Sequence, residues 1–262
     1  MKRVAMFSGG KDSAATMIIM RDLGIPPDIV IFCEVMFDKE RGISGELPEH
    51  REWIYGTAKP IIESWGSEFV VVKGKKDYVT IFHERIAKTT KHPEREGLKK
   101  GFPIAGRCVI KRDCKIRPVQ NYLRNIKEPY TQFLGIAADE VKRLPLEKNC
   151  RSVLYEQGIV EREAFEIARR NKLLSPIYDT GKRGGCWFCP SAPLCEFANT
   201  KTKHSALWKE LQELDKETEK VSPYFCYNKT FSEIDEEVDA TISRGLFRQM
   251  SMWELLQGRE SL

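Results

Sequence analysis

Apolar and polar residues alternate along the first 72 positions in a pattern typical of strands and helices in turn. Short apolar runs, rich in β-branched residues, predict buried strands, and longer mixed stretches predict helices. The predicted strands are residues 4–7, 29–32 and 68–72, and the predicted helices are residues 13–23 and 48–65. Strands that alternate with helices favour an α/β fold, with a mostly parallel twisted sheet and helices on both faces.

The rest of the chain is less regular and predicts a second region. Residues 73–106 carry long polar stretches and predict a lid or insertion. Further predicted elements are a strand at 130–136, a short helix from Ala138, and helices at 117–125, 161–171, 203–221 and 233–257. We expect an α/β domain over residues 1–178 and a cysteine-rich, helical region over residues 179–262.

A glycine-rich hexapeptide, Ser-Gly-Gly-Lys-Asp-Ser, joins the first predicted strand to the first predicted helix. Glycines allow the backbone to approach an anion closely, and the amides and dipole at a helix N-terminus favour negative charge. Lysine adds a cation and the serines add hydroxyl donors. The hexapeptide therefore predicts a phosphate-binding loop, formed by Ser8, Gly9, Gly10, Lys11, Asp12 and Ser13. It lacks the G-x-x-x-x-G-K-[ST] spacing of a Walker loop.

Composition limits the class of protein. Of the 262 residues 41% are hydrophobic and 31% are charged, which is typical of a soluble globular chain. No apolar run reaches the roughly 18 residues of a membrane span. The first predicted strand leads directly into the glycine loop, so we expect no signal peptide and a cytoplasmic protein.

Charge is distributed unevenly along the chain. Residues 73–127 contain 16 Lys and Arg against 5 Asp and Glu, while the whole chain carries a net charge of only +5. The remainder is therefore acidic. A basic segment of this kind predicts contact with an anionic substrate or a nucleic acid. A solvated, mobile insertion explains the same charge equally well.

Eight cysteines are present, and three of them form a CxxCx₅C pattern. A reducing compartment disfavours structural disulfides, so this clustering predicts metal binding or redox chemistry. We expect Cys186, Cys189 and Cys195 to bind one metal centre, with Cys108 as the fourth ligand and Cys114 as its alternative. Four thiolates suit either a [4Fe–4S] cluster or a structural Zn²⁺, and spacing does not separate the two. A redox dithiol remains a further alternative.

The hexapeptide resembles the PP-loop of the N-type ATP pyrophosphatases. Two later motifs extend the resemblance: Arg107-Cys108 followed by a Lys-x-x-Pro at Lys115, and a Gly-Ile-x-x-x-Glu-x-x-Arg that begins at Gly135. Together they resemble the phosphoadenosine phosphosulfate (PAPS) reductase family of the PP-loop superfamily. Some members of that superfamily hold iron–sulfur clusters.

The resemblance implies an adenine nucleotide alpha hydrolase-like fold that binds ATP with Mg²⁺. The loop residues would hold the phosphates, Glu34 would lie near the adenosine, and Gly135 and Glu140 would lie on the opposite wall. The catalytic residues implied in this way are Lys11, Asp12, Lys115 and Arg143. Arg117 is expected to face the anionic part of the substrate.

Two departures favour ATP over PAPS as the nucleotide. The final 14 residues contain no cysteine, so the E-C-G-[IL]-H segment of the reductases is missing, and Lys11 is retained where those reductases tend to lack it. The expected activity is adenylylation of a substrate with release of pyrophosphate, in the service of sulfur transfer to a nucleic acid. The alternatives are a sulfonucleotide reductase and a non-enzymatic nucleotide-binding accessory protein with structural zinc. The oligomeric state is left open.

Overall fold

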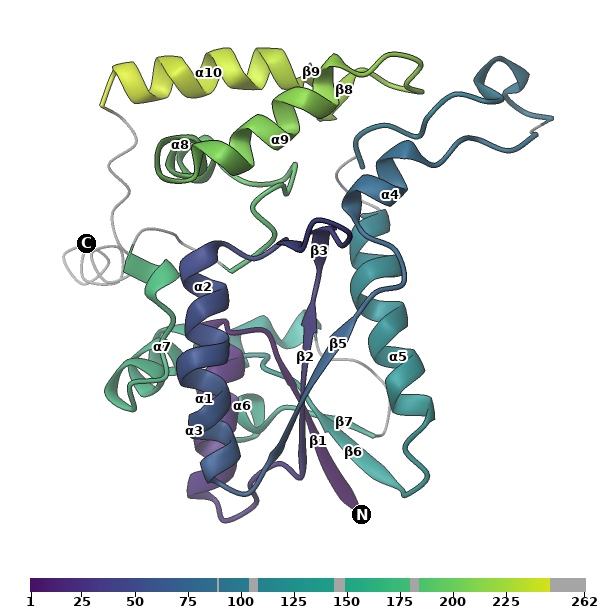
Figure 1. The fold of residues 1–262 in the computed structure, drawn as a ribbon. Helices are drawn as coiled ribbons and strands as arrows, with labels where there is room; N and C mark the ends of the chain where they lie inside the picture. The colour runs from purple at the N-terminus through teal and green to yellow at the C-terminus, as the bar shows by residue number, and fades with distance from the viewer. Residues whose placement is uncertain (89, 104–107, 144–148, 180–183, 246–262) are drawn as a thin grey trace.

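A five-stranded parallel sheet forms the centre of the protein. The computed structural model describes the chain except for residues 89, 104–107, 144–148, 180–183 and 246–262 (Figure 1). The strand order is β5-β2-β1-β6-β7, and every neighbouring pair is parallel. The strands are β1 (Lys2–Phe7), β2 (Ile29–Glu34), β5 (Glu68–Lys73), β6 (Tyr130–Phe133) and β7 (Cys150–Arg151). The predicted α/β fold with a parallel sheet is thereby confirmed.

The strand order reverses direction beside β1. From β1 the chain proceeds outward through β2 to β5 on one side, and it later returns to β6 and β7 on the other side. In open parallel sheets, ligands bind at the carboxyl ends of the strands where the order reverses. The loop after β1 lies at this point, because α1 (Lys11–Asp22) begins four residues after β1 ends.

Helices cover both faces of the sheet (Figure 1). On one face, α1, α3 (Lys59–Ser64) and α7 (Glu161–Arg170) share an apolar core with the strands. On the other face, Leu123 of α5 (Arg117–Arg124) packs against Val4 and Ile31. Strand β2 is buried along its whole length, as a run of Ile, Val, Phe and Cys between two helical layers would require.

The helix predicted for residues 48–65 forms as three connected pieces. These are α2 (Pro48–Trp53), a π-helical turn η1 (Ile54–Ala58) and α3. Pro60 lies in the first turn of α3, where its missing amide costs no helical hydrogen bond. The wider turn therefore accommodates the proline without ending the helix.

A second apolar core lies beyond the carboxyl edge of the sheet. It joins β3 (Met36–Asp38) and α4 (Tyr78–His83) to the three C-terminal helices α8 (Leu194–Lys203), α9 (Ser205–Lys216) and α10 (Phe231–Ser243). Tyr78, Phe82 and Phe102 are buried in it. The segment expected to be a lid thus contributes three aromatic side chains to a packed interior, while residues after α4 extend outward as an arm (Figure 1).

The remaining elements are short. They are β4 (Ile43–Ser44), α6 (Val153–Glu156), β8 (Tyr224–Cys226), β9 (Lys229–Thr230), and the helical turns η2 (Pro93–Arg95), η3 (Lys111–Ile116), η4 (Ala138–Arg143) and η5 (Pro176–Asp179). The helix expected at 203–221 is wrong at both ends: the chain turns at His204 between α8 and α9, and α9 ends at Lys216 because Glu217 is extended. The end of the helix expected at 233–257 lies outside the described residues. No helix of the described residues is long and apolar enough to cross a membrane.

Candidate functional site

The glycine loop, residues 8–13, opens onto a large cleft with a volume of about 1060 Å³. That volume is at the upper end of the range for small-molecule sites and accommodates a nucleotide. The loop itself, η3, Arg143 at the end of η4 and Tyr178 of η5 surround the cleft. Its floor is apolar and includes Met6 of β1, Ile31 of β2, and Leu134 and Ile136 just after β6.

The loop presents the N-terminus of α1 to this cleft. Gly9 has a φ of +73°, a left-handed conformation that favours glycine, and Gly10 occupies the N-cap position without a side chain to cap the helix. The Ser13 hydroxyl donates to the Gly10 carbonyl (2.8 Å) and accepts from the Ser8 amide (3.2 Å), which closes the turn. The first helical amides therefore lie along the cleft, with the positive end of the helix dipole.

His50 supports the loop from behind. A Cβ on Gly9 would lie 2.4 Å from the His50 ring, so the loop fits only with glycine there. The ring nitrogens lie 2.7 Å from the Ser175 hydroxyl and 3.3 Å from the Ser8 carbonyl. Burial lowers the pKa of His50, so the ring stays neutral in this position. Its contacts are those of a structural support rather than of a group that meets substrate.

Lys11 is held by two carboxylates. Its ammonium lies 2.9 Å from Asp12 and 3.1 Å from Glu161, and its side chain is only 9% exposed. Burial acts to lower the pKa of Lys11, but the charges of Asp12 and Glu161 outweigh it and the pKa is raised. The lysine is therefore charged and positioned at the loop, with acidic partners that a bound anion would have to replace.

Three carboxylates converge beside this lysine. Oxygens of Asp12, Glu140 and Glu161 lie within 4.8 Å of one another, the only such set of potential metal ligands among the described residues. Burial raises the pKa of Asp12 despite the nearby Lys11. Glu140 also pairs with Arg143 through one oxygen. Carboxylate oxygens are ligands that Mg²⁺ prefers, so this group could hold a metal ion.

Gly135 lines the cleft and lies directly against the loop. A Cβ at this position would be 2.7 Å from the Ser13 amide nitrogen and 2.8 Å from the Asp12 carbonyl carbon. Glycine therefore allows the backbone after β6 to contact the backbone of the loop. Glu140 adjoins the loop through the acidic group, so Gly135 and Glu140 both lie beside the loop, on the β6 side of the sheet and across β1 from β2.

The far wall is formed by η3, a π-helical turn. Lys115 lines the cleft as expected, and Lys111 lines it as well. No described residue forms an ion pair with either lysine. Sequence reasoning missed Lys111, although its four-residue spacing from Lys115 placed both on one helical face. It also missed Glu161 and Tyr178, whose hydroxyl accepts a hydrogen bond from the Lys11 amide (2.8 Å).

Glu34 is a structural anchor and does not line the cleft. Its fully buried carboxylate binds Arg51 (2.7 Å), Tyr55 (2.7 Å) and Lys73 (3.0 Å). Burial opposes ionisation, but the hydrogen bonds from Tyr55, Arg51 and Lys73 prevail and lower the pKa of Glu34 to about 2. The carboxylate ties β2 to α2, η1 and β5. Glu34 is the last residue of β2, as expected, but its side chain binds Arg51, Tyr55 and Lys73 instead of entering the cleft.

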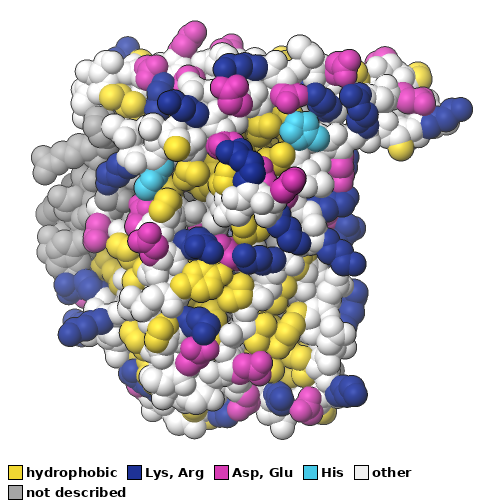
Figure 2. Space-filling view, viewed as in Figure 1, with side chains coloured by type: hydrophobic (Ala, Val, Ile, Leu, Met, Phe, Trp, Pro, Cys, Tyr) yellow, Lys and Arg dark blue, Asp and Glu magenta, His cyan; other side chains and the backbone are white. Residues whose placement is uncertain are grey.

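The basic segment forms a groove of its own. Lys73, Lys75, Lys76 and Arg117 line a hollow of about 340 Å³ beside α5, outside the main cleft. Figure 2 shows Lys and Arg side chains gathered along this edge of the molecule. Arg117 is paired with Asp113 (2.8 Å), and it does not line the cleft. The expected role of Arg117 at the substrate therefore receives no support from its position.

Three cysteines from distant segments pack on the buried core that contains Tyr78. They are Cys108, Cys186 and Cys226. Burial raises the pKa of Tyr78. Cys226 reaches this core because the hairpin of β8 and β9 folds back: its thiol donates to the Pro190 carbonyl at 3.2 Å.

Cys114, the alternative fourth ligand, contacts another cysteine. The Cys33 thiol donates to the Cys114 carbonyl at 3.4 Å, and both side chains are buried. Burial raises the pKa of Cys33 to about 11 and that of Cys114 to about 12. Both behave as protonated, packed side chains.

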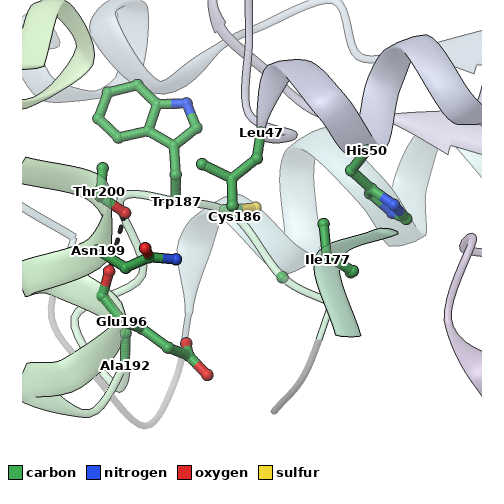
Figure 3. A pocket seen from close by; sticks show the side chains of 10 residues that line it. Leu47, His50, Ile177, Cys186, Trp187, Ala192, Glu196, Asn199 and Thr200 are labelled. Carbon is green, nitrogen blue, oxygen red and sulfur yellow. Dashed lines mark hydrogen bonds between the residues drawn. The ribbon is translucent and has the colours of Figure 1, made fainter. Parts of the chain in front are cut away.

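A small cavity separates the cysteines from the glycine loop. It is lined by Cys186 and Trp187, by Leu47 and His50 at the start of α2, and by Ile177 (Figure 3). Its volume of about 40 Å³ holds a water or two and no nucleotide. His50 thus contacts the loop on one side and this cavity on the other, so the two groups of residues are near neighbours.

No protein-family model matches the chain, and no curated protein matches it either. The assignment of a function therefore depends on the geometry of the cleft and of the cysteine group.

Proposed function

We propose that the protein is a PAPS reductase-like PP-loop enzyme that binds ATP at the glycine loop and activates a substrate by adenylylation, with release of pyrophosphate. The observation that carries this proposal is the N-terminus of α1, uncapped at Gly10 and open to a cleft large enough for a nucleotide. Helix amides, Lys11 and the serine hydroxyls together supply the donors that a polyphosphate requires.

An exchange of partners at Lys11 would accompany binding. Mg²⁺ held by Asp12, Glu140 and Glu161 would neutralise the carboxylates that now hold the lysine. The ammonium would then be free to bind phosphate oxygens, where it stabilises the charge that develops on the departing pyrophosphate. The loop and the acidic group thus act as one unit. Mg²⁺ and the Lys11 ammonium reach their final partners only when the nucleotide is bound.

The two ends of the cleft suit different parts of the reactants. The apolar floor, with Met6 and Ile136, is suited to the adenine ring, and the far wall supplies Lys111 and Lys115, which have no acidic partners among the described residues. An anionic acceptor placed between these lysines and the loop would face the α-phosphate. The basic groove at Lys73, Lys75 and Arg117 provides a further surface for a nucleic acid acceptor.

Binding of ATP and release of pyrophosphate test the proposal directly. We expect ATP with Mg²⁺ to raise the melting temperature, since ligand at 100 times its Kd stabilises a protein by about 2.7 kcal/mol. Lys11→Ala should weaken ATP binding about tenfold or more, equivalent to about 1.4 kcal/mol, and should abolish ATP–pyrophosphate exchange.

Lys59→Ala is the matched control, because Lys59 pairs with Glu63 on the exposed face of α3. It should leave both measurements unchanged. A protein that neither binds ATP nor is stabilised by ATP with Mg²⁺ would refute the proposal. ATP binding without exchange, with any acceptor offered, would instead identify the accessory protein.

The sulfonucleotide reductase fits the cleft less well. Its nucleophile would be Cys226 or a thiol of the CxxC pair. Burial raises the pKa of Cys226 to about 11 and also raises the pKa of Cys186, and the thiolate is the reactive form. Cys226 also lies beside Pro190 and does not line the cleft. Thiol-dependent release of sulfite from PAPS would restore this alternative.

A further inference from the structure

We infer that His50 is a positioning residue for the glycine loop: it orients the peptide between Ser8 and Gly9 so that the Gly9 amide donates to a bound phosphate. This inference deepens the proposed function and rests on it, because it assigns one further donor to the phosphates. His50 itself lies behind the loop and does not line the nucleotide cleft.

The partners of His50 define which ring nitrogen carries the proton. Nδ1 lies 2.7 Å from the Ser175 hydroxyl, and Nε2 lies 3.3 Å from the Ser8 carbonyl. A carbonyl oxygen only accepts hydrogen bonds, so Nε2 carries the proton and Nδ1 accepts from the Ser175 hydroxyl. That hydroxyl in turn accepts from the Ile177 amide (3.4 Å), as a group that donates to His50 can. The neutral ring therefore has one tautomer in this position.

The fold holds the ring in place. His50 is 1% exposed and stacks on Trp53, with the ring planes 9° apart and the centroids 6.1 Å apart. A carboxylate oxygen of Glu46 lies 3.7 Å from Nε2. That separation is beyond hydrogen-bond distance, so the Nε2 proton is directed to the Ser8 carbonyl. The loop thus meets a donor whose direction is fixed by the surrounding residues.

The Ser8 carbonyl sets the direction of the amide that follows it. The described peptide bonds are trans, and in a trans peptide the carbonyl and the amide point in opposite directions. Because the Ser8 carbonyl faces His50, the Gly9 amide points away from the ring, to the side where Ser8 and Gly10 line the cleft. The Gly9 amide donates to no residue that the structure describes. It is therefore available to an anion in the cleft.

A second contact increases the importance of this amide. The Lys11 amide, the first of α1, already donates to the Tyr178 hydroxyl (2.8 Å). An anion at the loop therefore depends more on the amides that remain, and Gly9 supplies one of them just before the helix. Ser175 and Tyr178 belong to one short segment, so this segment holds two peptide groups of the loop, one through His50 and one directly.

The first experiment compares His50→Gln with His50→Asn in the full chain. A glutamine amide reaches the position of Nε2 and keeps the donor to Ser8, whereas an asparagine amide reaches only the position of Nδ1 and keeps the contact with Ser175. Both variants lose the ring, so both should lose similar unfolding free energy.

Calorimetry with ATP and Mg²⁺ separates the two variants. We expect His50→Gln to bind within about threefold of the wild type and His50→Asn to bind about tenfold more weakly or worse, because a hydrogen bond to a charged group is lost. Equal loss of affinity in both variants would mean that His50 only fills space, and would refute the positioning role.

Nuclear magnetic resonance on the wild type covers the case in which the variants fail to fold. The His50 ring should show a protonated Nε2 and an unprotonated Nδ1 at neutral pH. Inorganic pyrophosphate with Mg²⁺ should move the Gly9 amide proton downfield. A protonated Nδ1 in the neutral ring, or a Gly9 signal that does not respond while the Ser13 signal does, would overturn the inference.

The inference and the proposed function fail in different ways. A wild type that binds neither ATP nor pyrophosphate would refute the proposed function and this inference with it. Binding of ATP by the wild type, with equal weakening in the two His50 variants, would refute the inference alone.

Discussion

The glycine loop and the cysteine group are built in opposite ways. In the loop, six consecutive residues supply most of the contacts, and the important atoms belong to the backbone: the amides of α1 and the turn closed by Ser13. In the cysteine group, Cys108, Cys186 and Cys226 come from three segments and pack against one aromatic core. The first site is therefore local and can be read from a short motif. The second exists only when distant segments fold together.

The largest expected effect tests the dependence of the cysteine group on its core. Phe188 is 2% exposed and packs on Phe37 and Tyr78. Phe188→Ala should lower the free energy of unfolding by about 4 kcal/mol, because it leaves a cavity between buried rings. Urea unfolding measures this loss. Tyr227→Ala, at a 79% exposed position beside Cys226, should change it by less than about 0.5 kcal/mol. A similar loss in both variants would mean that the core does not support the group.

The next effect tests whether the loop depends on backbone contact. Gly135→Ala would place a methyl group 2.7 Å from the Ser13 amide nitrogen, and backbone cannot move aside as a side chain can. We expect a loss of about 3 kcal/mol in unfolding free energy, together with weaker ATP binding. Gly56→Ala is the control, since a methyl group added there, within the helical turn η1, would have no neighbour within 4 Å among the described residues. That variant should be neutral or slightly stabilising. If Gly135→Ala changed neither the unfolding free energy nor ATP binding, the loop backbone would be shown to tolerate displacement by a methyl group.

A third prediction concerns Glu34, which connects the sheet to α2 near both sites. Its pKa is about 2 in the folded protein and about 4.5 ordinarily. A lowered pKa means that its stabilisation is fully present above pH 4.5 and is lost as the pH falls from 4.5 towards 2. Glu34→Gln should cost about 2 kcal/mol at pH 7, because Arg51 and Lys73 lose their charged partner.

Unfolding free energy measured from pH 7 to pH 3 checks this prediction. The wild type should lose stability relative to Glu34→Gln as the pH falls, and the two curves should converge. Glu63→Gln, which breaks only the exposed pair with Lys59, should run parallel to the wild type. Parallel curves for Glu34→Gln and wild type would contradict the assigned pKa.

The smallest effect tests the contact between the loop and η5. Tyr178→Phe removes the acceptor for the Lys11 amide and should cost about 1 kcal/mol of stability without nucleotide. The freed amide can then bind phosphate, so ATP affinity should be equal or slightly higher. Calorimetry on the variant, beside Tyr155→Phe at a 45% exposed position, measures both quantities. A large loss of ATP affinity would instead make Tyr178 a ligand of the nucleotide.

Much of the N-terminal fold could be predicted because its signals are local. The runs that form β1, β2 and β5 are short, apolar and separated by helical stretches, and the structure places all three in one parallel sheet. The sequence signals were weaker for elements whose position depends on tertiary packing. α4 lies in a polar stretch of sequence, yet Tyr78 and Phe82 are buried against the C-terminal helices.

The site residues divide in the same way, into those that a local motif predicts and those that tertiary packing places. Ser8, Lys11 and Asp12 follow from the motif, and Lys115 lines the cleft as expected. Glu34 was misplaced because position along a strand does not determine which network captures a side chain at its end. Cys226 was not grouped with the CxxC pair because spacing counts neighbours along the chain, whereas a hairpin can bring a residue 36 positions from Pro190 into contact with it.

The sequence by itself determined the alternation of strands and helices and the glycine loop at the end of β1, because both depend on interactions between residues close together in the chain. Only the tertiary structure decided that Glu161 and Glu140 join Asp12, that Lys111 faces the cleft, and that Cys226 contacts Pro190, next to the CxxC pair. These groupings depend on how helices and hairpins pack across the carboxyl edge of the sheet. Packing is a property of surfaces that meet in space, and no local pattern specifies it.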